Sequence, residues 1–298
     1  MLIGDRALYI APNGQQYSFA PPTFIIQEDG ALGTAPIEYV TQRGPFQHGE
    51  SVKAFFLRPR TIQVIVRRQG ISRNDYHTLR AQIMNILAPN TIDGQLRPGI
   101  FRKYLSNGVV REYEVFVTEG PSFPSHPPDS WDEWSIRDTI RFTAYDPVAR
   151  DPAIQGVQYT VPLSTGGTFP LTFPIQMASF GIAATAINYV GNWLSYPTIY
   201  ITGPVFSPSI INQTTGEQIV LAYSIPMGFT VIIDLSYGQK SVVRNDGVSL
   251  IGYITNDSDL GTFHLAPGVN QIQVLGTGTS PGSTSILVQW YNRYLGAA

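Results

Sequence analysis

Acidic and amide side chains gather in the stretch YITNDSDLGTFHLAPGVNQIQV, which spans residues 253–274. Asn256, Asp257 and Asp259 carry the oxygen atoms that Ca²⁺ prefers as ligands. Their spacing lacks the glycine and the closing glutamate that an EF-hand loop needs. Asn and Asp also favour turns, because their side chains hydrogen-bond the nearby backbone. We therefore interpret these three residues as a turn that precedes a strand, a Pro-Gly turn and a second strand.

The histidine of the same stretch is a second candidate for chemistry. His264 lies between Phe263 and Leu265 in an alternating pattern, so its side chain would point away from the face that these two share. We interpret it as a surface residue instead of a metal ligand. The other histidines are far apart in the sequence and form no pair with zinc-ligand spacing; they are His48, His77 and His126.

Carboxylates concentrate at one further place, the segment PPDSWDEWSIR. Asp129, Asp132 and Glu133 could supply the paired carboxylates of a glycoside hydrolase. The segment is a Pro-rich loop, and nothing fixes a second carboxylate opposite it. The sequence also lacks a nucleophile elbow, a P-loop and a dinucleotide-binding fingerprint. We predict no catalytic residue, no metal and no cofactor, and a wall hydrolase is the least favoured function.

Aromatic side chains are the remaining candidates for binding. Tyrosine and tryptophan can stack on the flat face of a sugar while their polar tips form hydrogen bonds. Such rings more often fill cores and subunit interfaces. Four tryptophans are therefore predicted as contacts in an interface or with a glycan: Trp131, Trp134, Trp193 and Trp290.

Length and composition restrict the class of protein to which these residues belong. The chain has 298 residues, enough for two domains, with 43% hydrophobic and only 13% charged residues. It has no cysteine, so disulfides and thiolate metal sites are excluded. A net charge of −2 gives no electrostatic basis for gripping nucleic acid. Asp5 and Arg6 interrupt any signal-peptide core, and no apolar run is long enough to span a bilayer, so we expect a soluble protein.

Charge divides the sequence into two halves. Residues 1–150 hold 16 of the 19 Lys and Arg and 15 of the 21 Asp and Glu. The change falls at YDPVARDPAIQG, where two Asp-Pro pairs and a glycine are typical of a linker. We predict one domain over residues 1–150 and a second over residues 151–298.

Alternation of apolar and polar residues predicts strands in the first half, at 61–67, 111–117 and 135–145. Asn107-Gly108 predicts a hairpin turn before the second of these strands. Residues 72–90 instead show helical spacing, with a capping-box serine at the start and Pro89 at the end.

The second half predicts an antiparallel β-sandwich, because short strands recur there between Gly, Pro and Asn residues. Asp246-Gly247 and Pro267-Gly268 fit hairpin turns. The predicted strands are TIYITG, EQIVLAYSI, FTVIIDLSYG, KSVVR, VSLIGYI, GTFHLA, NQIQVLG and TSILVQWYNRYL.

The order of several phrases resembles a known family. RGPFQHGESVKAFFLRPRTIQVIVRRQG (43–70) is followed by the helical segment and by IRFTAYDP (140–147). In the second half, PTIYITGPVFSPSIINQTTGEQIVL (197–221) precedes a phrase that ends in L-x-P-G-x-N-x-I. This arrangement resembles the distal tail protein of long-tailed, non-contractile bacteriophages, the siphovirus-type tail component family.

The resemblance implies a mainly β fold and a structural role. The expected architecture is an N-terminal β-barrel or sandwich "belt" domain with one α-helix, followed by a C-terminal galectin-like or carbohydrate-module-like sandwich. Members form a hexameric ring at the distal end of the tail tube, where they join the tube to tip and receptor-binding proteins. Genomic DNA passes through the channel without specific binding. The resemblance thus implies a non-enzymatic virion protein at the tail tip, made in the cytoplasm of the bacterial host.

A carbohydrate-binding adhesin that contacts the host surface is the alternative function. The two roles differ in whether the second domain binds a glycan directly. For the ring, we further predict a channel without a dense Lys/Arg stripe, because each phosphate that a cation neutralises adds affinity for DNA. The arginines would then face interfaces between subunits or rings.

Overall fold

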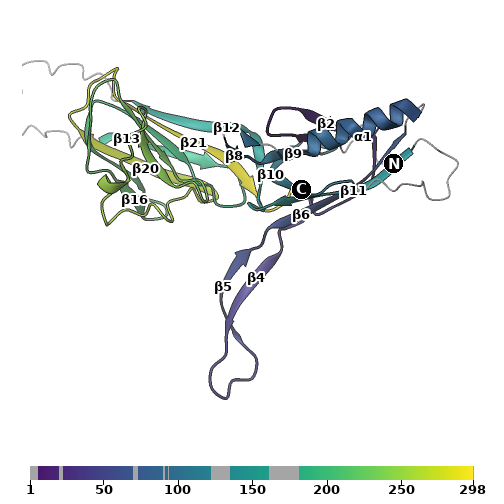
Figure 1. The fold of residues 1–298 in the computed structure, drawn as a ribbon. Helices are drawn as coiled ribbons and strands as arrows, with labels where there is room; N and C mark the ends of the chain where they lie inside the picture. Colours follow the sequence, from purple (N-terminus) through teal and green to yellow (C-terminus); the bar gives the residue numbers. More distant parts are fainter. Residues whose placement is uncertain are drawn as a thin grey trace, which may run out of the picture. The chain divides into compact units, whose positions relative to one another are not determined.

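The structure is a computed structural model, shown in Figure 1, and describes residues 6–19, 23–69, 73–89, 91–92, 94–121, 135–160 and 181–297. The chain forms two compact units. Unit 1 comprises Met1–Pro152 together with Tyr294–Ala298, and unit 2 comprises Ala153–Arg293. The chain therefore passes between the units twice, within strands β12 (Ala149–Thr160) and β21 (Ser285–Tyr294).

Antiparallel strands form the framework of unit 1. Ile62, Val64 and Val66 alternate along one strand and are fully buried, because a strand turns every second side chain to the same face. This strand, β6, lies between two neighbours in the order β3-β6-β11-β10. The bounds are β3 (Thr23–Asp29), β6 (Arg60–Gln69), β10 (Val110–Glu119) and β11 (Ser135–Ala144).

A second group of strands continues from β10 and confirms the predicted hairpin turn at Asn107-Gly108. The amide of Gly108 donates to the carbonyl of Leu105 at 3.0 Å, which closes the turn between β9 and β10. Strand β9 also pairs with β1, and β1 pairs with β2. These strands are β1 (Arg6–Ile10), β2 (Gln16–Ser18) and β9 (Gly99–Tyr104).

One helix, α1 (Arg73–Leu87), belongs to unit 1, as predicted. It buries Leu79, Ile83 and Leu87 at helical spacing, and Pro89 follows its end. The predicted capping serine lies outside the described residues. The helix shares one apolar core with the strands, and the aromatic members of that core are Tyr9, Tyr17, Phe19, Phe101, Tyr113 and Phe142.

Unit 2 is an antiparallel β-sandwich, as predicted. One sheet has the order β19-β18-β14-β21, and the other has the order β13-β20-β15-β16, with β17 beside β15. Their inward side chains form a single buried cluster. The strands are β13 (Gly181–Tyr189), β14 (Thr198–Thr202), β15 (Val205–Asn212), β16 (Glu217–Val220), β17 (Ser224–Ile225), β18 (Thr230–Asp234), β19 (Ser241–Arg244) and β20 (Gly268–Thr277).

Two of the predicted strands in unit 2 are wrong. VSLIGYI contains a short 3₁₀ helix, η1 (Ile251–Tyr253). GTFHLA contributes only an isolated bridge between Leu265 and Ser195. Pro267-Gly268 therefore joins no hairpin, since β20 pairs with β13 and β15 instead. The Asp246-Gly247 turn is confirmed by the hydrogen bond from the Arg244 amide to the Val248 carbonyl, 2.9 Å.

Two small two-stranded pieces complete the described part of the chain. Strands β7 (Thr91–Ile92) and β8 (Gln95–Leu96) form a short ribbon after α1. Strands β4 (Ile37–Gln42) and β5 (Ser51–Leu57) form a longer hairpin. In the described residues, no helix has the length and apolar character that a bilayer crossing requires.

Candidate interaction surfaces

The β4–β5 hairpin, residues 37–57, projects from unit 1 just before β6 (Figure 1); we call it the arm. Its two strands pair with each other from Ile37–Leu57 at the base to Gln42–Ser51 near the tip. Within the described residues they pair with no further strand. An isolated two-stranded hairpin is at best marginally stable in water, so the arm has the character of a segment completed by a partner.

Apolar side chains lie exposed along the arm. A strand with one buried face would alternate apolar and polar residues, but here both faces are exposed and both carry apolar groups. Clustered exposed apolar side chains mark interaction sites more often than solvent-facing surface. Those of the arm are Ile37, Tyr39, Val40, Phe46, Val52, Phe55 and Phe56.

The loop of the arm, residues 43–50, holds a phenylalanine in an unusual conformation. Phe46 has φ +60° and a side chain that is 102% exposed relative to a reference residue. A bulky residue in the left-handed region costs roughly 1–3 kcal/mol and needs support from its surroundings. Gln47 gives that support, since its Oε1 accepts from the Gly44 amide at 2.9 Å and its Nε2 donates to Ser51 Oγ at 3.0 Å.

At the base of the arm, a buried arginine joins three distant segments. Arg60 is 2% exposed, and its guanidinium donates to the carbonyls of Gly30 at 2.6 Å and Gly33 at 2.7 Å. It also donates to Pro147 O at 2.9 Å and Leu295 O at 2.6 Å. Loss of the guanidinium would leave these carbonyls without this donor, so Arg60 holds together the three segments that carry them.

An aromatic ring adjoins this arginine. Tyr113 lies with its ring centre 5.0 Å from the Arg60 guanidinium carbon, and its hydroxyl donates to Ala31 O at 2.6 Å. Burial lowers the pKa of Arg60 from its usual value. Burial also raises the pKa of Tyr113 to about 12, and the nearby Arg60 charge opposes that rise only in part.

The segment before the arm leaves no room for larger residues. Gly30 has φ +90°, and a Cβ there would lie 2.0 Å from the carbonyl oxygen of Thr61. At the chain's other end, a Cβ on Gly296 would lie 2.6 Å from the carbonyl oxygen of Gly33. These two glycines therefore permit backbone packing around Arg60 that other residues would prevent.

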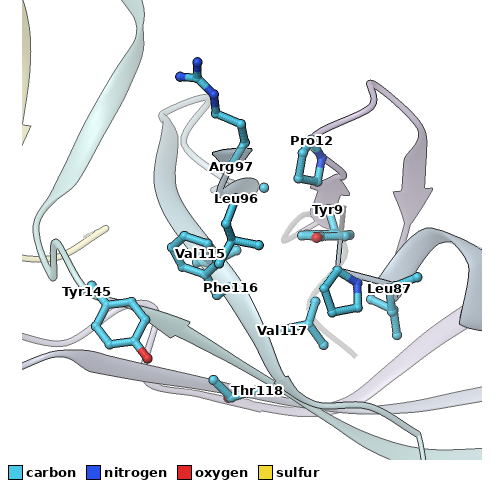
Figure 2. A pocket seen from close by; sticks show the side chains of 13 residues that line it. Tyr9, Pro12, Leu87, Leu96, Arg97, Val115, Phe116, Val117, Thr118 and Tyr145 are labelled. Atoms are coloured by element: carbon cyan, nitrogen blue, oxygen red, sulfur yellow. The ribbon is translucent and has the colours of Figure 1, made fainter. Parts of the chain in front are cut away.

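An apolar cavity of about 290 Å³ opens elsewhere on unit 1. Figure 2 shows Tyr9 and Pro12 on one side of it and Leu96 and Phe116 on the other. The remaining lining residues come from the end of α1 and the two residues after it, from the link between β8 and β9, from β9 and β10 and from Tyr145; they are Leu87, Ala88, Pro89, Arg97, Gly99, Val115, Val117, Thr118 and Tyr145. Leu96 and Tyr145 are largely exposed, so the cavity is accessible from solvent.

Many of the charges of unit 1 neutralise one another on its sheets. Arg102 pairs with the buried Glu112 at 2.5 Å, and Arg150 pairs with Glu114 at 2.5 Å. Arg111 pairs with Asp151 at 2.5 Å, and Lys103 pairs with Glu28 at 2.7 Å with both side chains almost fully buried. These cations are therefore engaged within the chain, and breaking a buried pair would leave an uncompensated charge.

The acid-rich part of the stretch, residues 254–267, is a loop with isolated bridges, and the stretch then enters β20. Asp259 accepts a hydrogen bond from the Gln218 amide at 2.9 Å, which ties the loop to β16. The Nδ1 of His264 lies 3.0 Å from Glu217 Oε2 and 2.8 Å from Thr262 O. His264 keeps part of its surface exposed while Phe263 and Leu265 are buried, so it lies off their shared face, as predicted, and it contacts Glu217. In the described residues, no group of three or more His, Asp or Glu side chains is placed to hold a metal ion.

The asparagine of the phrase L-x-P-G-x-N-x-I, which ends this stretch, is buried and has a structural role. Asn270 is fully buried and its Oδ1 accepts from Asn212 Nδ2 at 3.1 Å and from the Ala266 amide at 3.0 Å. Its Nδ2 donates to Ala266 O at 2.7 Å. The side chain thereby supplies hydrogen bonds that a strand partner would otherwise give to residues around 264–268.

The predicted tryptophan contacts fall in different places. Trp131 and Trp134 lie outside the described residues, as do Asp129, Asp132, Glu133 and His126. Trp290 is 6% exposed and belongs to the core of unit 2, so its ring offers no free face to a glycan. Trp193 is half-buried, and its amide donates to Arg293 O at 3.1 Å.

Two tyrosines that sequence reasoning did not single out are more exposed than either described tryptophan. Tyr237 is 74% exposed and lies 5.7 Å from the Tyr196 ring, while Tyr253 lies 5.1 Å from the Tyr223 ring. Exposed rings beside other rings suit stacking on an apolar or sugar face. No local pattern distinguishes them, because their exposure depends on which strands cover the neighbouring positions.

Comparison with known proteins supports the resemblance seen in the sequence. Residues 190–294 match the family described as "Siphovirus-type tail component, C-terminal domain". No curated protein matches the sequence. The resemblance to this family is therefore confirmed over the greater part of unit 2.

Solved structures match over nearly the whole chain. SPP1 Dit (gp 19.1), described as a paradigm of hub adsorption apparatus in phages that infect Gram-positive hosts, matches with TM-score 0.63 at 15% identity, covering 97% of this chain and 98% of that chain. Chains of the phage P2 baseplate in its activated conformation also match, with TM-score 0.52 for the Ca form and 0.50 for the Sr form, each at 8% identity. Coverage is 97% and 98% for the first, and 96% and 97% for the second. At these identities the likeness establishes the fold, which is mainly β, as predicted.

Proposed function

We propose that this chain, whose residues 190–294 match the siphovirus-type tail component family, is a structural subunit of a bacteriophage virion. Six copies form a ring at the distal end of the tail tube. The ring joins the tube to tip and receptor-binding proteins and leaves a channel for the genome. In this proposal unit 1 is the belt domain that closes the ring, and unit 2 is the sandwich domain that holds tip proteins; residues 294–298, predicted to belong to the second domain, return to unit 1.

The observation that carries the proposal is the likeness of fold to SPP1 Dit over 97% of the chain. The arm gives independent support, because its exposed apolar side chains suit a contact with another polypeptide. A ring also requires two different complementary patches on each subunit, since a head-to-tail contact joins unlike surfaces. The arm and the remainder of unit 1 can supply such unlike patches.

Ion pairing supports the expectation of a channel that does not bind DNA. Arg102, Arg111 and Arg150 are each paired with a carboxylate of the same chain. Paired cations neutralise fewer phosphates, so they add less salt-dependent affinity for a passing duplex. We therefore expect no retention of this protein on duplex DNA at physiological salt.

The proposal is tested by assembly of the full chain alone and with the tail tube protein of the same phage. We expect six-fold rings with an open channel in electron micrographs and a hexamer in native mass spectra. Gold-labelled antibodies against this chain should decorate intact virions at the end of the tail. A chain that remains monomeric at high concentration, even with the tube protein present, would contradict the ring.

A carbohydrate-binding role of unit 2 is the second candidate, favoured by the exposed rings of Tyr237 and Tyr253. A glycan array with the full chain separates the two functions. Saturable binding that Tyr237→Ala or Tyr253→Ala abolishes would establish the adhesin role. The hub role alone predicts no saturable binding, and both variants should assemble like the unaltered chain.

A further inference from the structure

Two apolar surfaces of unit 1, the arm and the cavity, are left uncovered by the described part of the same chain. The strands of the arm pair only with each other, and Phe46 at its loop is fully exposed. The cavity of about 290 Å³ is open and lined mainly by apolar side chains. A concave apolar pocket and a projecting apolar loop are complementary types of surface.

We propose that the arm of one copy of this chain docks its loop, with Phe46 foremost, into the cavity of a neighbouring copy. The inference rests on the proposed ring and assigns the contact that joins its subunits. Tyr9, Leu96 and Phe116 of the cavity would surround the incoming ring (Figure 2). Aromatic side chains that fill such pockets contribute strongly to interfaces, because they bury a large area with few rotatable bonds.

A second copy fits these features better than an unrelated partner does. One arm-to-cavity contact covers both surfaces, whereas a different protein bound at either feature would leave the other exposed. The contact is heterologous, since the donor surface and the acceptor surface differ. Repetition of a heterologous contact closes a ring when the rotation between copies divides a full turn into a whole number of equal steps, without a shift along the axis.

The loop has the rigidity that such an insertion requires. Gln47 forms hydrogen bonds with Gly44 and Ser51 on both sides of the loop, and Arg43 Nε donates to Gln47 O at 3.0 Å. These contacts hold Phe46 outward before any partner arrives. A loop ordered in advance loses less conformational entropy on binding.

Charge complements the apolar contact at its edge. Glu50 ends the loop and is exposed, while Arg97 lines the cavity and extends away from its floor (Figure 2). In the described part of the chain neither side chain forms an ion pair. Docking of the loop would bring a carboxylate to the rim that carries this guanidinium, and such a pair favours the correct orientation.

The first test alters each partner surface beside a matched control, in the full chain. Phe46→Asn removes the ring and tolerates the left-handed backbone, and its control is Met227→Asn, an exposed apolar residue of unit 2. Leu96→Glu places a charge in the cavity, and its control Gln95→Glu adds the same charge on the same short strand outside the lining. Circular dichroism and thermal unfolding verify that all four variants fold.

Native mass spectrometry and analytical ultracentrifugation then measure assembly under conditions in which the unaltered chain forms rings. We expect Phe46→Asn and Leu96→Glu each to weaken ring formation at least tenfold, while both controls assemble normally. If either test variant forms rings at the same protein concentration as the unaltered chain, the docking proposal is wrong, but the proposed ring is not affected. An unaltered chain that forms no ring at all would refute the proposed function, and the docking with it.

Mixing the two defective variants gives the sharper result. The intact arm of the Leu96→Glu copy can enter the intact cavity of the Phe46→Asn copy, but the two remaining surfaces are both defective. An equimolar mixture should therefore form heterodimers and stop there. A mixture that stays monomeric, or that closes full rings, would contradict the pairing of arm with cavity.

Charge exchange tests the orientation. Glu50→Arg and Arg97→Glu should each weaken assembly several-fold, and the double variant should restore it, because the pair is re-formed with opposite sign. Two losses that simply add in the double variant would show that these side chains do not meet across the contact.

Discussion

Arg60 and Tyr113 share one acceptor, the carbonyl oxygen of Ala31: the tyrosine hydroxyl donates to it at 2.6 Å and the guanidinium at 3.4 Å. The guanidinium carbon also lies 5.0 Å from the centre of the tyrosine ring. Two side chains from different strands thus hold the segment that leads into the arm. The segment that precedes the arm is thus held by a buried cation and a tyrosine, while the arm's own strands pair with no further strand in the described residues.

Loss of the Arg60 guanidinium should destabilise unit 1. Arg60→Met removes the donors to Gly30, Gly33, Pro147 and Leu295. Buried carbonyls left without a donor cost roughly 1–3 kcal/mol each, so we expect a loss of at least ~3 kcal/mol in the free energy of unfolding, measured by urea denaturation. The control is Arg58→Met, because the Arg58 side chain is 61% exposed and pairs with Glu38, which is also exposed. It should leave the free energy of unfolding nearly unchanged, because solvent screens an exposed ion pair; equal losses in the two variants would refute the anchoring role.

Deletion of residues 295–298 should act on the same anchor. It removes the Leu295 carbonyl that accepts from Arg60 and the buried side chain of Ala297. We expect a loss of roughly 2 kcal/mol in the free energy of unfolding. Combined with Arg60→Met, the deletion should cost less than the sum of the two, because they share one contact. Strict additivity would show that the tail and Arg60 act independently.

Alkaline pH should weaken the fold through Tyr113. Its pKa is about 12 when folded against 10.0 for the free side chain, because burial disfavours the phenolate. The folded state retains the proton longer, so the stabilisation is complete below pH 10 and is lost as pH rises towards 12. The loss over this range is roughly 2–3 kcal/mol. Urea denaturation at pH 9 and pH 11.5 measures it. Tyr113→Phe should remove this part of the dependence and leave the part due to Tyr159, whose pKa burial also raises to about 12. A dependence that the substitution does not change would contradict the role of Tyr113.

Asn270 should be essential to the sandwich of unit 2. Asn270→Ala removes both the acceptor for Asn212 and the donor to Ala266 from a fully buried position. We expect a loss of about 2–4 kcal/mol in the free energy of unfolding. Gln271→Ala, at the exposed neighbouring position, is the control and should change stability by less than ~0.5 kcal/mol. A similar response in both variants would exclude the bonding role of the amide.

Local alternation was enough to predict strands such as β6, because Ile62, Val64 and Val66 reveal a buried face without knowledge of what covers it. The helix followed from the same local logic, through Leu79 and Ile83. The segment around Leu265 was predicted wrongly as a strand. Its alternation is real, but Asn270 and a single bridge to Ser195 satisfy its backbone in place of a neighbouring strand.

The candidate surfaces were harder to predict, since their properties arise between distant residues. Arg60 stands in a charged Arg-Pro-Arg phrase, and its burial depends on carbonyls near residues 30, 147 and 295. The sequence of the arm's strands is as apolar as that of core strands. Only the structure shows that no other described part of the chain packs over them. Trp290 shows the opposite: its residue type suits binding, but its side chain is buried in the core of unit 2.

The division of unit 1 between Met1–Pro152 and Tyr294–Ala298 has a consequence for how such chains can diversify. Unit 2 is an insertion within unit 1, and its two ends are neighbours, because Gly156 packs against Leu287 and Gln289. A module whose ends meet can be exchanged for another of different size without redirecting the host chain. Exchange of the sandwich would leave the contacts around Arg60 unchanged, because the carbonyls that it binds near residues 30, 147 and 295 all belong to unit 1.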